Sequence, residues 1–216
     1  MQMKLYGISG LGADKRVFEH LSLDCAFIPI EWIEPLENEP IEDYSIRLSK
    51  AINQEEDFGI IGVSFGGLVA VEISKRLKPK LTILVSSVET RLELRRLYRI
   101  IGKTTIIRRL PQFLFDPPRV VAHWLFGARH KKLLNQILDD TDLNFAKWAV
   151  NQLTKWNNEE RLSNPILKIV GTRDKLIPPS KDDSQQCIVH GEHFMIVDRA
   201  TEISLLINER IKKMNK

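Results

Sequence analysis

The sequence predicts an α/β fold in which a mainly parallel sheet of about six strands lies between two layers of helices. Up to residue 87, short apolar stretches rich in β-branched residues alternate with stretches of helical periodicity, a pattern typical of strands joined by crossover helices. Residues 88–163 show helical periodicity only, and the alternation then resumes. We therefore expect an α/β core of residues 1–87 and 164–216, with a helical insertion at residues 88–163.

The individual elements follow from apolar periodicity and from the residues that start and stop helices. Strands are expected at residues 4–8, 25–32, 58–63, 81–85, 166–170 and 187–189. Core helices are expected at residues 14–21, 41–52, 65–77, 180–186 and 203–211. Helices of the insertion are expected at residues 92–101, 104–115, 118–126, 131–138 and 141–156. Asp14 and Thr141 suit helix N-caps, and Pro29 favours an edge position for the second strand.

The most informative stretch is Gly62-Val63-Ser64-Phe65-Gly66, where a buried strand turns directly into a helix. A serine at such a sharp turn has a strained backbone, and the residues two before and two after it must be very small. Gly62 and Gly66 stand at those two positions. The pattern predicts an exposed, nucleophilic Ser64. Its alternative is a glycine-rich turn whose serine caps the helix.

Composition sets broad limits on the function. The chain has 216 residues, of which 43% are hydrophobic and 28% charged, as in ordinary globular proteins. We find no apolar run of membrane-spanning length and no signal peptide, and we expect a cytoplasmic protein. Cys25 and Cys187 lack metal-ligand spacing. We expect both to be reduced and to pack as small core residues.

Positive charge is concentrated in the insertion. Residues 88–163 contain 14 Lys and Arg against 8 Asp and Glu. The arginines at its start are Arg91, Arg95, Arg96 and Arg99. They are interpreted either as a solvated face or as groups that attract an anionic substrate. No nucleic-acid-binding motif accompanies them, so we do not expect a nucleic acid partner.

A serine nucleophile needs a general base, normally a histidine that is itself held by a carboxylate. His193 lies in a loop beyond the last expected strand, and Asp174 follows the strand at residues 166–170. The carboxyl ends of parallel strands meet at one edge of the sheet, so both side chains are expected near Ser64. Asp174 can instead cap its own turn, and Glu89 is its main competitor as the acid. His190 is expected only to end a strand.

Four segments resemble those of the α/β-hydrolases, and the similarity runs over essentially the whole chain. The segments are GISGLG at residues 7–12, GVSFGG at 62–67, GTRDKLIP at 171–178 and GEHFM at 191–195. The chain order of serine, acid and histidine is also the one found in that family. The resemblance implies that Ser64 is the nucleophile, Asp174 the acid and His193 the base. It also implies an oxyanion hole made by the backbone amides of Leu11 and Phe65.

The sequence departs from the family pattern in two ways. Many relatives have His-Gly where this chain has Ser9-Gly10, a change that keeps the backbone amides but can alter how the loop is anchored. The two strands that lead the family's sheet have no counterpart here. We therefore expect a minimal sheet of six parallel strands with the Cys25 and Cys187 strands at opposite edges, a geometry that excludes a disulfide between them.

By resemblance, residues 88–163 are a mobile cap over the active site, and the expected activity is that of a serine hydrolase. It would cleave a small-molecule carboxylic ester or thioester through an acyl-enzyme on Ser64, without a metal or organic cofactor. One alternative is a lyase or acyltransferase on the same scaffold. Another is a small-molecule-binding protein without catalysis. The sequence predicts neither the substrate nor the oligomeric state.

Overall fold

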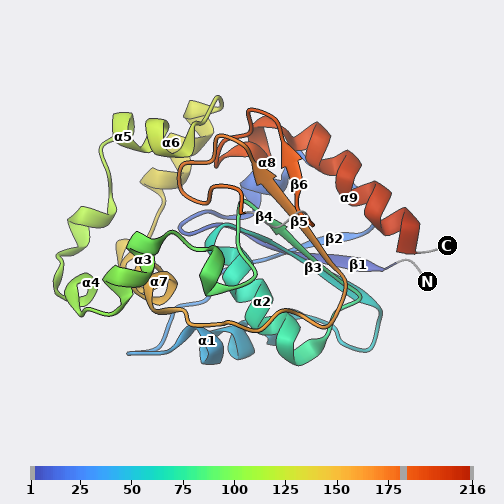
Figure 1. Cartoon of the computed structure of the whole chain (residues 1–216), viewed down its shortest axis with the longest axis horizontal. Helices are drawn as coiled ribbons and strands as arrows, with labels where there is room; N and C mark the ends of the chain where they lie inside the picture. Colours follow the sequence, from blue (N-terminus) through green and yellow to red (C-terminus); the bar gives the residue numbers. More distant parts are fainter. Residues whose placement is uncertain (1–2, 181–183, 215–216) are drawn as a thin grey trace.

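The core of the molecule is a parallel sheet whose strand order places the strand that leads into Ser64 near its centre (Figure 1). The computed structural model describes residues 3–180 and 184–214. Within them the strands are β1 (Lys4–Ile8), β2 (Phe27–Ile30), β3 (Phe58–Val63), β4 (Leu81–Val85), β5 (Ile166–Gly171) and β6 (Gln186–Ile188). Their order is β2-β1-β3-β4-β5-β6, and the neighbouring strands pair in parallel. The predicted six-stranded parallel sheet is confirmed, with β2 and β6 at its edges.

Helices cover both faces of the sheet because its strands are apolar on both sides. The core helices are η1 (Lys15–Phe18), α1 (Ile41–Leu48), η2 (Ser49–Ala51), α2 (Phe65–Leu77), α8 (Met195–Asp198) and α9 (Ala200–Met214). In β3, Ile60 packs in the cluster that contains α1 and α2, whereas Ile61 packs in the cluster that contains η1, α8 and α9. Figure 1 shows α1 and α2 on one side of the sheet and α9 on the other.

Between β4 and β5, residues 88–163 contain helices and no strand, and the structure describes all of them. We refer to this segment as the insertion. Its helices are η3 (Arg91–Glu93), α3 (Arg96–Gly102), α4 (Ile106–Arg109), η4 (Gln112–Phe115), α5 (Arg119–Phe126), α6 (Lys131–Asp139) and α7 (Leu143–Lys155). In Figure 1 they occupy the end of the molecule opposite the two chain termini.

The longest helix of the insertion, α7, joins the core rather than standing apart from it. Phe145 and Trp148 stack among Trp32, Tyr44 and Phe65, with ring centroids 4.5 to 6.4 Å apart. The Trp148 indole also donates a hydrogen bond of 2.9 Å to the Glu39 carbonyl. One part of the insertion is therefore fixed to α1, to the start of α2 and to the segment between β2 and α1.

Several local predictions need correction. Cys187 is exposed and is not a core residue, because β6 is a three-residue edge strand with little cover. The N-cap of α7 is Asp142, whose carboxylate accepts from the Asn144 amide, and not Thr141. The helix expected at residues 104–115 is broken into α4 and η4, with Pro111 at the break. The helix expected at residues 180–186 lies partly outside the described residues.

Both cysteines are free thiols. Cys25 lies two residues before β2 and is half-buried, and the two cysteines lie at opposite edges of the sheet as expected. Across the part of the chain that the structure describes, we find no helix that could cross a lipid bilayer.

Candidate active site

Ser64 sits at the junction of β3 and α2 with the strained backbone that its neighbouring glycines predict. Its φ and ψ angles are 51° and −120°, a conformation that costs an L-residue on the order of 1–3 kcal/mol. A Cβ added to Gly62 would lie 2.4 Å from the Gly66 carbonyl oxygen, and one added to Gly66 would lie 2.1 Å from the Ser9 carbonyl oxygen. Only glycine fits at either position, so the turn holds the Ser64 side chain out above the sheet.

The structure brings together the three side chains that the sequence singles out. His193 Nε2 lies 2.9 Å from Ser64 Oγ, and His193 Nδ1 lies 2.8 Å from Asp174 Oδ2. With its proton on Nδ1, the imidazole donates to the carboxylate and leaves Nε2 free to accept from the serine hydroxyl. His193 and Asp174 are both buried, while Ser64 is partly accessible. The hydroxyl is therefore the accessible end of a hydrogen-bond chain whose other two members are buried.

Asp174 is held as a carboxylate by the groups around it. Its Oδ1 accepts from the backbone amides of Ile177 at 2.8 Å and Leu176 at 2.9 Å. Burial by itself raises the pKa of Asp174, but the charge and hydrogen bond of His193 and the amides of Ile177 and Leu176 outweigh burial and lower that pKa. Asp174 does cap its own turn, as the alternative interpretation proposed, and it also holds the histidine.

Glu89, the competing acid, is used elsewhere. It is buried and accepts a hydrogen bond of 2.8 Å from the Leu162 amide, and it lies 3.7 Å from the Lys168 ammonium. These contacts join the two ends of the insertion to β5. His190 is exposed, and its amide donates to the Thr172 hydroxyl. Neither residue takes part in the chain that ends at Ser64.

A cavity of about 320 Å³ opens next to Ser64 and His193. Its roof comes from the insertion, and its apolar lining includes Tyr98, Ile101, Ile107, Phe115, Leu134, Ile137, Leu143, Val150 and Leu153. No lysine or arginine among the described residues lines it. A larger and more open groove of about 630 Å³ lies between α1 and α7 and contains none of the three site residues. The space that adjoins the serine is thus apolar.

Side-chain hydrogen bonds anchor the loop that carries Leu11. The Ser9 hydroxyl donates to the Ala13 carbonyl at 2.7 Å, and the Trp32 indole donates to the same carbonyl at 3.0 Å. On the other side of the site, Phe65 is the first residue of α2, so its amide has no acceptor within the helix. Leu11 and Phe65 both line the cavity beside Ser64.

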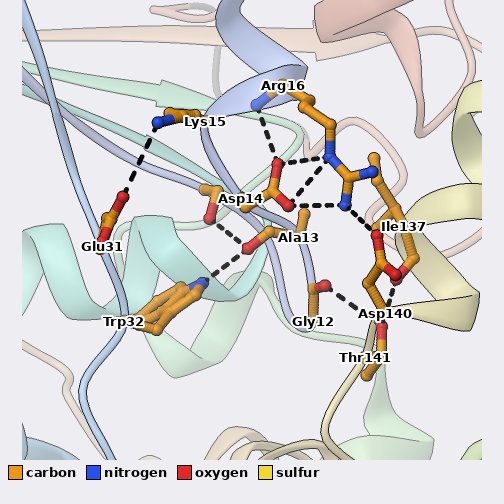
Figure 2. Close-up of polar contacts among 11 residues, drawn as sticks. Gly12, Ala13, Asp14, Lys15, Arg16, Glu31, Trp32, Ile137, Asp140 and Thr141 are labelled. Carbon is orange, nitrogen blue, oxygen red and sulfur yellow. Dashed lines mark hydrogen bonds and ion pairs between the residues drawn. The ribbon is translucent and has the colours of Figure 1, made fainter.

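The insertion also holds this loop, as Figure 2 shows. The Thr141 hydroxyl lies 3.1 Å from the Gly12 carbonyl oxygen and 2.7 Å from the Ile137 carbonyl oxygen. Arg16 pairs with Asp14 at 2.6 Å and with Asp140 at 2.7 Å. Gly12 and Arg16 are therefore tied to the segment between α6 and α7.

Comparison with solved structures supports this architecture. The similar structures include ClbQ from the colibactin pathway (15% identity, 100% of this chain and 99% of that one, TM-score 0.70). They also include an esterase from Thermogutta terrifontis (15%, 100% and 92%, TM-score 0.71) and the RedJ thioesterase from Streptomyces coelicolor (16%, 94% and 90%, TM-score 0.65). The chain has an α/β-hydrolase fold. No protein-family model and no curated protein sequence matches it.

Within this α/β-hydrolase fold, sequence reasoning missed the residues that support the site. The Ser87 hydroxyl donates to the Ser64 carbonyl at 2.7 Å and stands where a Cβ on Gly67 would be. The two serines that follow β4, Ser86 and Ser87, were the available signal. A hydroxyl at a strand end beside the Ser64 turn has few polar groups to bond to other than the backbone of that turn. The contacts of Thr141 and Asp140 left no signal, because they depend on how the insertion folds back.

Proposed function

We propose that the protein is a serine hydrolase that cleaves carboxylic esters or thioesters carrying an apolar acyl group. The observation that carries this proposal is the hydrogen-bond chain from Asp174 through His193 to Ser64, which ends beside an apolar cavity. The structurally similar esterase and thioesterase support the same class of reaction. The resemblance is one of fold, so the argument for activity rests on the site itself.

In the proposed reaction, Ser64 Oγ attacks the substrate carbonyl while its proton passes to His193 Nε2. The Asp174 carboxylate, 2.8 Å from Nδ1, stabilises the imidazolium that forms. The amides of Leu11 and Phe65 are proposed to donate to the oxyanion, an effect typically worth a few kcal/mol. His193 then protonates the leaving alcohol or thiol, and a water molecule releases the acyl group by a second attack of the same kind.

The insertion is proposed to act as a cap that selects the acyl group. Because the cavity lining is apolar, each methylene placed in it should add about 0.8 kcal/mol, or roughly a fourfold increase in kcat/KM. Activity should rise along a series of p-nitrophenyl esters until the cavity is full. Val150→Phe on α7 narrows the cavity and should shorten the preferred chain, whereas the same change at the exposed Val189 should not.

A fluorophosphonate probe tests the catalytic roles directly. The wild-type protein should be labelled at Ser64. Ser64→Ala and His193→Ala should each abolish labelling, and the double variant should be no worse than either single variant. His190→Ala is the control and should label normally. A folded wild-type protein that binds apolar esters but resists the probe would instead support the non-catalytic alternative.

A further inference from the structure

The outer surface of the insertion is unusually apolar. Of the twelve large apolar side chains that are exposed in the described part of the chain, nine lie between Leu92 and Trp124. Val120 is 81% exposed, Phe113 67% and Trp124 64%. Isolated exposed apolar residues are normal, but this concentration in a short stretch needs an explanation. We call the exposed surface of residues 91–126 the outer insertion face.

The helices of this stretch carry apolar side chains on two sides, one facing the cavity and one facing solvent. In α3, Tyr98 and Ile101 line the cavity, whereas Leu97 and Ile100 are each 61% exposed. In α4, Ile107 lines the cavity and Ile106 is exposed. The cavity explains the inward side chains. It does not explain the outward ones, which face solvent.

Basic residues lie among the exposed apolar ones. Residues 91–126 contain eight Lys and Arg against two Asp and Glu. Arg95, Arg96, Lys103 and Arg109 are exposed and make no ion pair with any of the residues that the structure describes. None of the four lines the cavity, so attraction of an anionic group to Ser64 does not account for them.

We propose that the outer insertion face docks on an anionic lipid surface. A surface that combines Leu, Phe and Trp with unpaired Arg and Lys can insert its apolar side chains at the headgroup boundary while the cations pair with lipid phosphates. Trp124 is the type of residue enriched at that boundary. The helices concerned form one end of the molecule, away from α9 (Figure 1). This inference does not rest on the proposed esterase activity.

The charge of the outer insertion face argues against the alternative that a second copy of this chain covers it. A symmetric dimer through this face would bring Arg95, Arg96, Lys103 and Arg109 of one copy close to the same residues of the other. Like charges without acids between them oppose such contact. An anionic bilayer instead complements both the charge and the apolar side chains, and it requires no matching shape.

Co-sedimentation with vesicles tests the proposal. The wild-type protein and Ser64→Ala should both bind vesicles of phosphatidylcholine mixed with phosphatidylglycerol, more weakly as salt is raised, and should bind phosphatidylcholine alone much less. Each basic residue near such a surface contributes about fivefold to partitioning, so Arg95→Gln/Arg96→Gln should bind roughly 25-fold less well. Lys212→Gln/Lys213→Gln removes the same charge from the end of α9 and should bind normally.

A second pair of variants tests the contribution of the apolar side chains to vesicle binding. Leu97→Ser should weaken binding about tenfold at every salt concentration, whereas Leu205→Ser, at a leucine of α9 exposed to a similar extent, should not. The six surface positions changed in these experiments (95, 96, 97, 205, 212 and 213) are exposed, so thermal unfolding should be unchanged in the surface variants.

Three results would overturn the proposal. The first is an absence of vesicle binding by the folded monomer. The second is that the wild-type protein binds neutral and anionic vesicles equally well, or that Arg95→Gln/Arg96→Gln binds anionic vesicles as well as wild type does. The third is a dimer, measured by light scattering, that Leu97→Ser dissociates while vesicles leave it intact, because this would assign the face to a second copy. Loss of activity in Ser64→Ala with normal vesicle binding separates this proposal from the catalytic one.

Discussion

Replacing Asp174 by asparagine tests the proposed site most sharply, because the two side chains have nearly the same shape. Asp174 Oδ1 accepts from the amides of Leu176 and Ile177, so the single oxygen of the asparagine side chain should remain there. The new NH₂ group then replaces Oδ2, 2.8 Å from His193 Nδ1. The NH₂ group can only donate, and the one remaining acceptor, Oδ1, lies 3.0 Å from Nδ1 but already accepts from two amides. We therefore expect the neutral ring to accept at Nδ1 and to carry its proton on Nε2.

The expected effect on catalysis follows from that change of tautomer. With a proton on Nε2, His193 donates to Ser64 Oγ and cannot remove its proton, so the general base is lost while the geometry is kept. The comparable change in serine proteases lowers kcat about 10⁴-fold, and we expect a decrease of that order here. KM should change much less, because the cavity lining is untouched. Single-turnover acylation by a p-nitrophenyl ester measures the step directly.

The chain offers a matched control. Asp198 lies 2.6 Å from His130 Nδ1 and also accepts from two backbone amides, those of Arg129 and His130. It repeats the contacts of Asp174 away from the cavity. Asp198→Asn should therefore leave kcat unchanged. The reasoning fails if Asp174→Asn retains kcat within tenfold of wild type, and the acid would be reassigned if Glu89→Gln lost activity instead.

Three further predictions concern the turn at Ser64, the loop that carries Leu11, and the dependence of stability on pH. Gly66→Ala should prevent stable folding, because its Cβ would lie 2.1 Å from a carbonyl oxygen, whereas Gly10→Ala, with 3.6 Å to its nearest neighbour, should keep a near-normal melting temperature. Thr141→Val should lower kcat roughly threefold to tenfold, well below the effect of losing an oxyanion donor, and Thr104→Val in the same assay should not. Because folding lowers the pKa of Asp174, its ionised form stabilises the native state above the ordinary carboxylate pKa of about 4, and this stabilisation is lost as the pH falls through the lowered pKa. Urea unfolding should therefore show wild type and Asp174→Asn becoming closer in stability below about pH 5, and a constant difference would contradict this.

The features that the sequence predicts well are those set by local or topological rules. The turn at Ser64 needs only its own strand, helix and glycines, all of which lie within a few residues. Asp174 and His193 could be placed near it because parallel strands bring their carboxyl ends to one edge. The catalytic roles of the three residues stay a prediction until they are tested by the variants above.

The insertion was harder to predict, because its helices are short and their partners are distant. Four residues of α4 are too few for periodicity to show which side faces inward. The exposure of Cys187 likewise depended on the absence of cover over β6, which no local pattern reveals. Apolar periodicity showed that α7 buries one face, but only the folded chain shows Phe145 and Trp148 packed on the core. The prediction of a mobile cap now applies better to α3–α5 than to α7.

The contacts of Thr141 with Gly12 and of Asp140 with Arg16 limit how this scaffold can be recombined. A chimera made by exchanging residues 88–163 for the corresponding segment of another protein with this fold would remove the Thr141 hydroxyl from the Gly12 carbonyl and the Asp140 carboxylate from Arg16. Such a chimera would have a new lining in the cavity beside Ser64, but the loop that carries Leu11 would have lost contacts that hold it in place. Donor insertions that supply a hydroxyl and a carboxylate at these two places should be the ones that yield active hybrids.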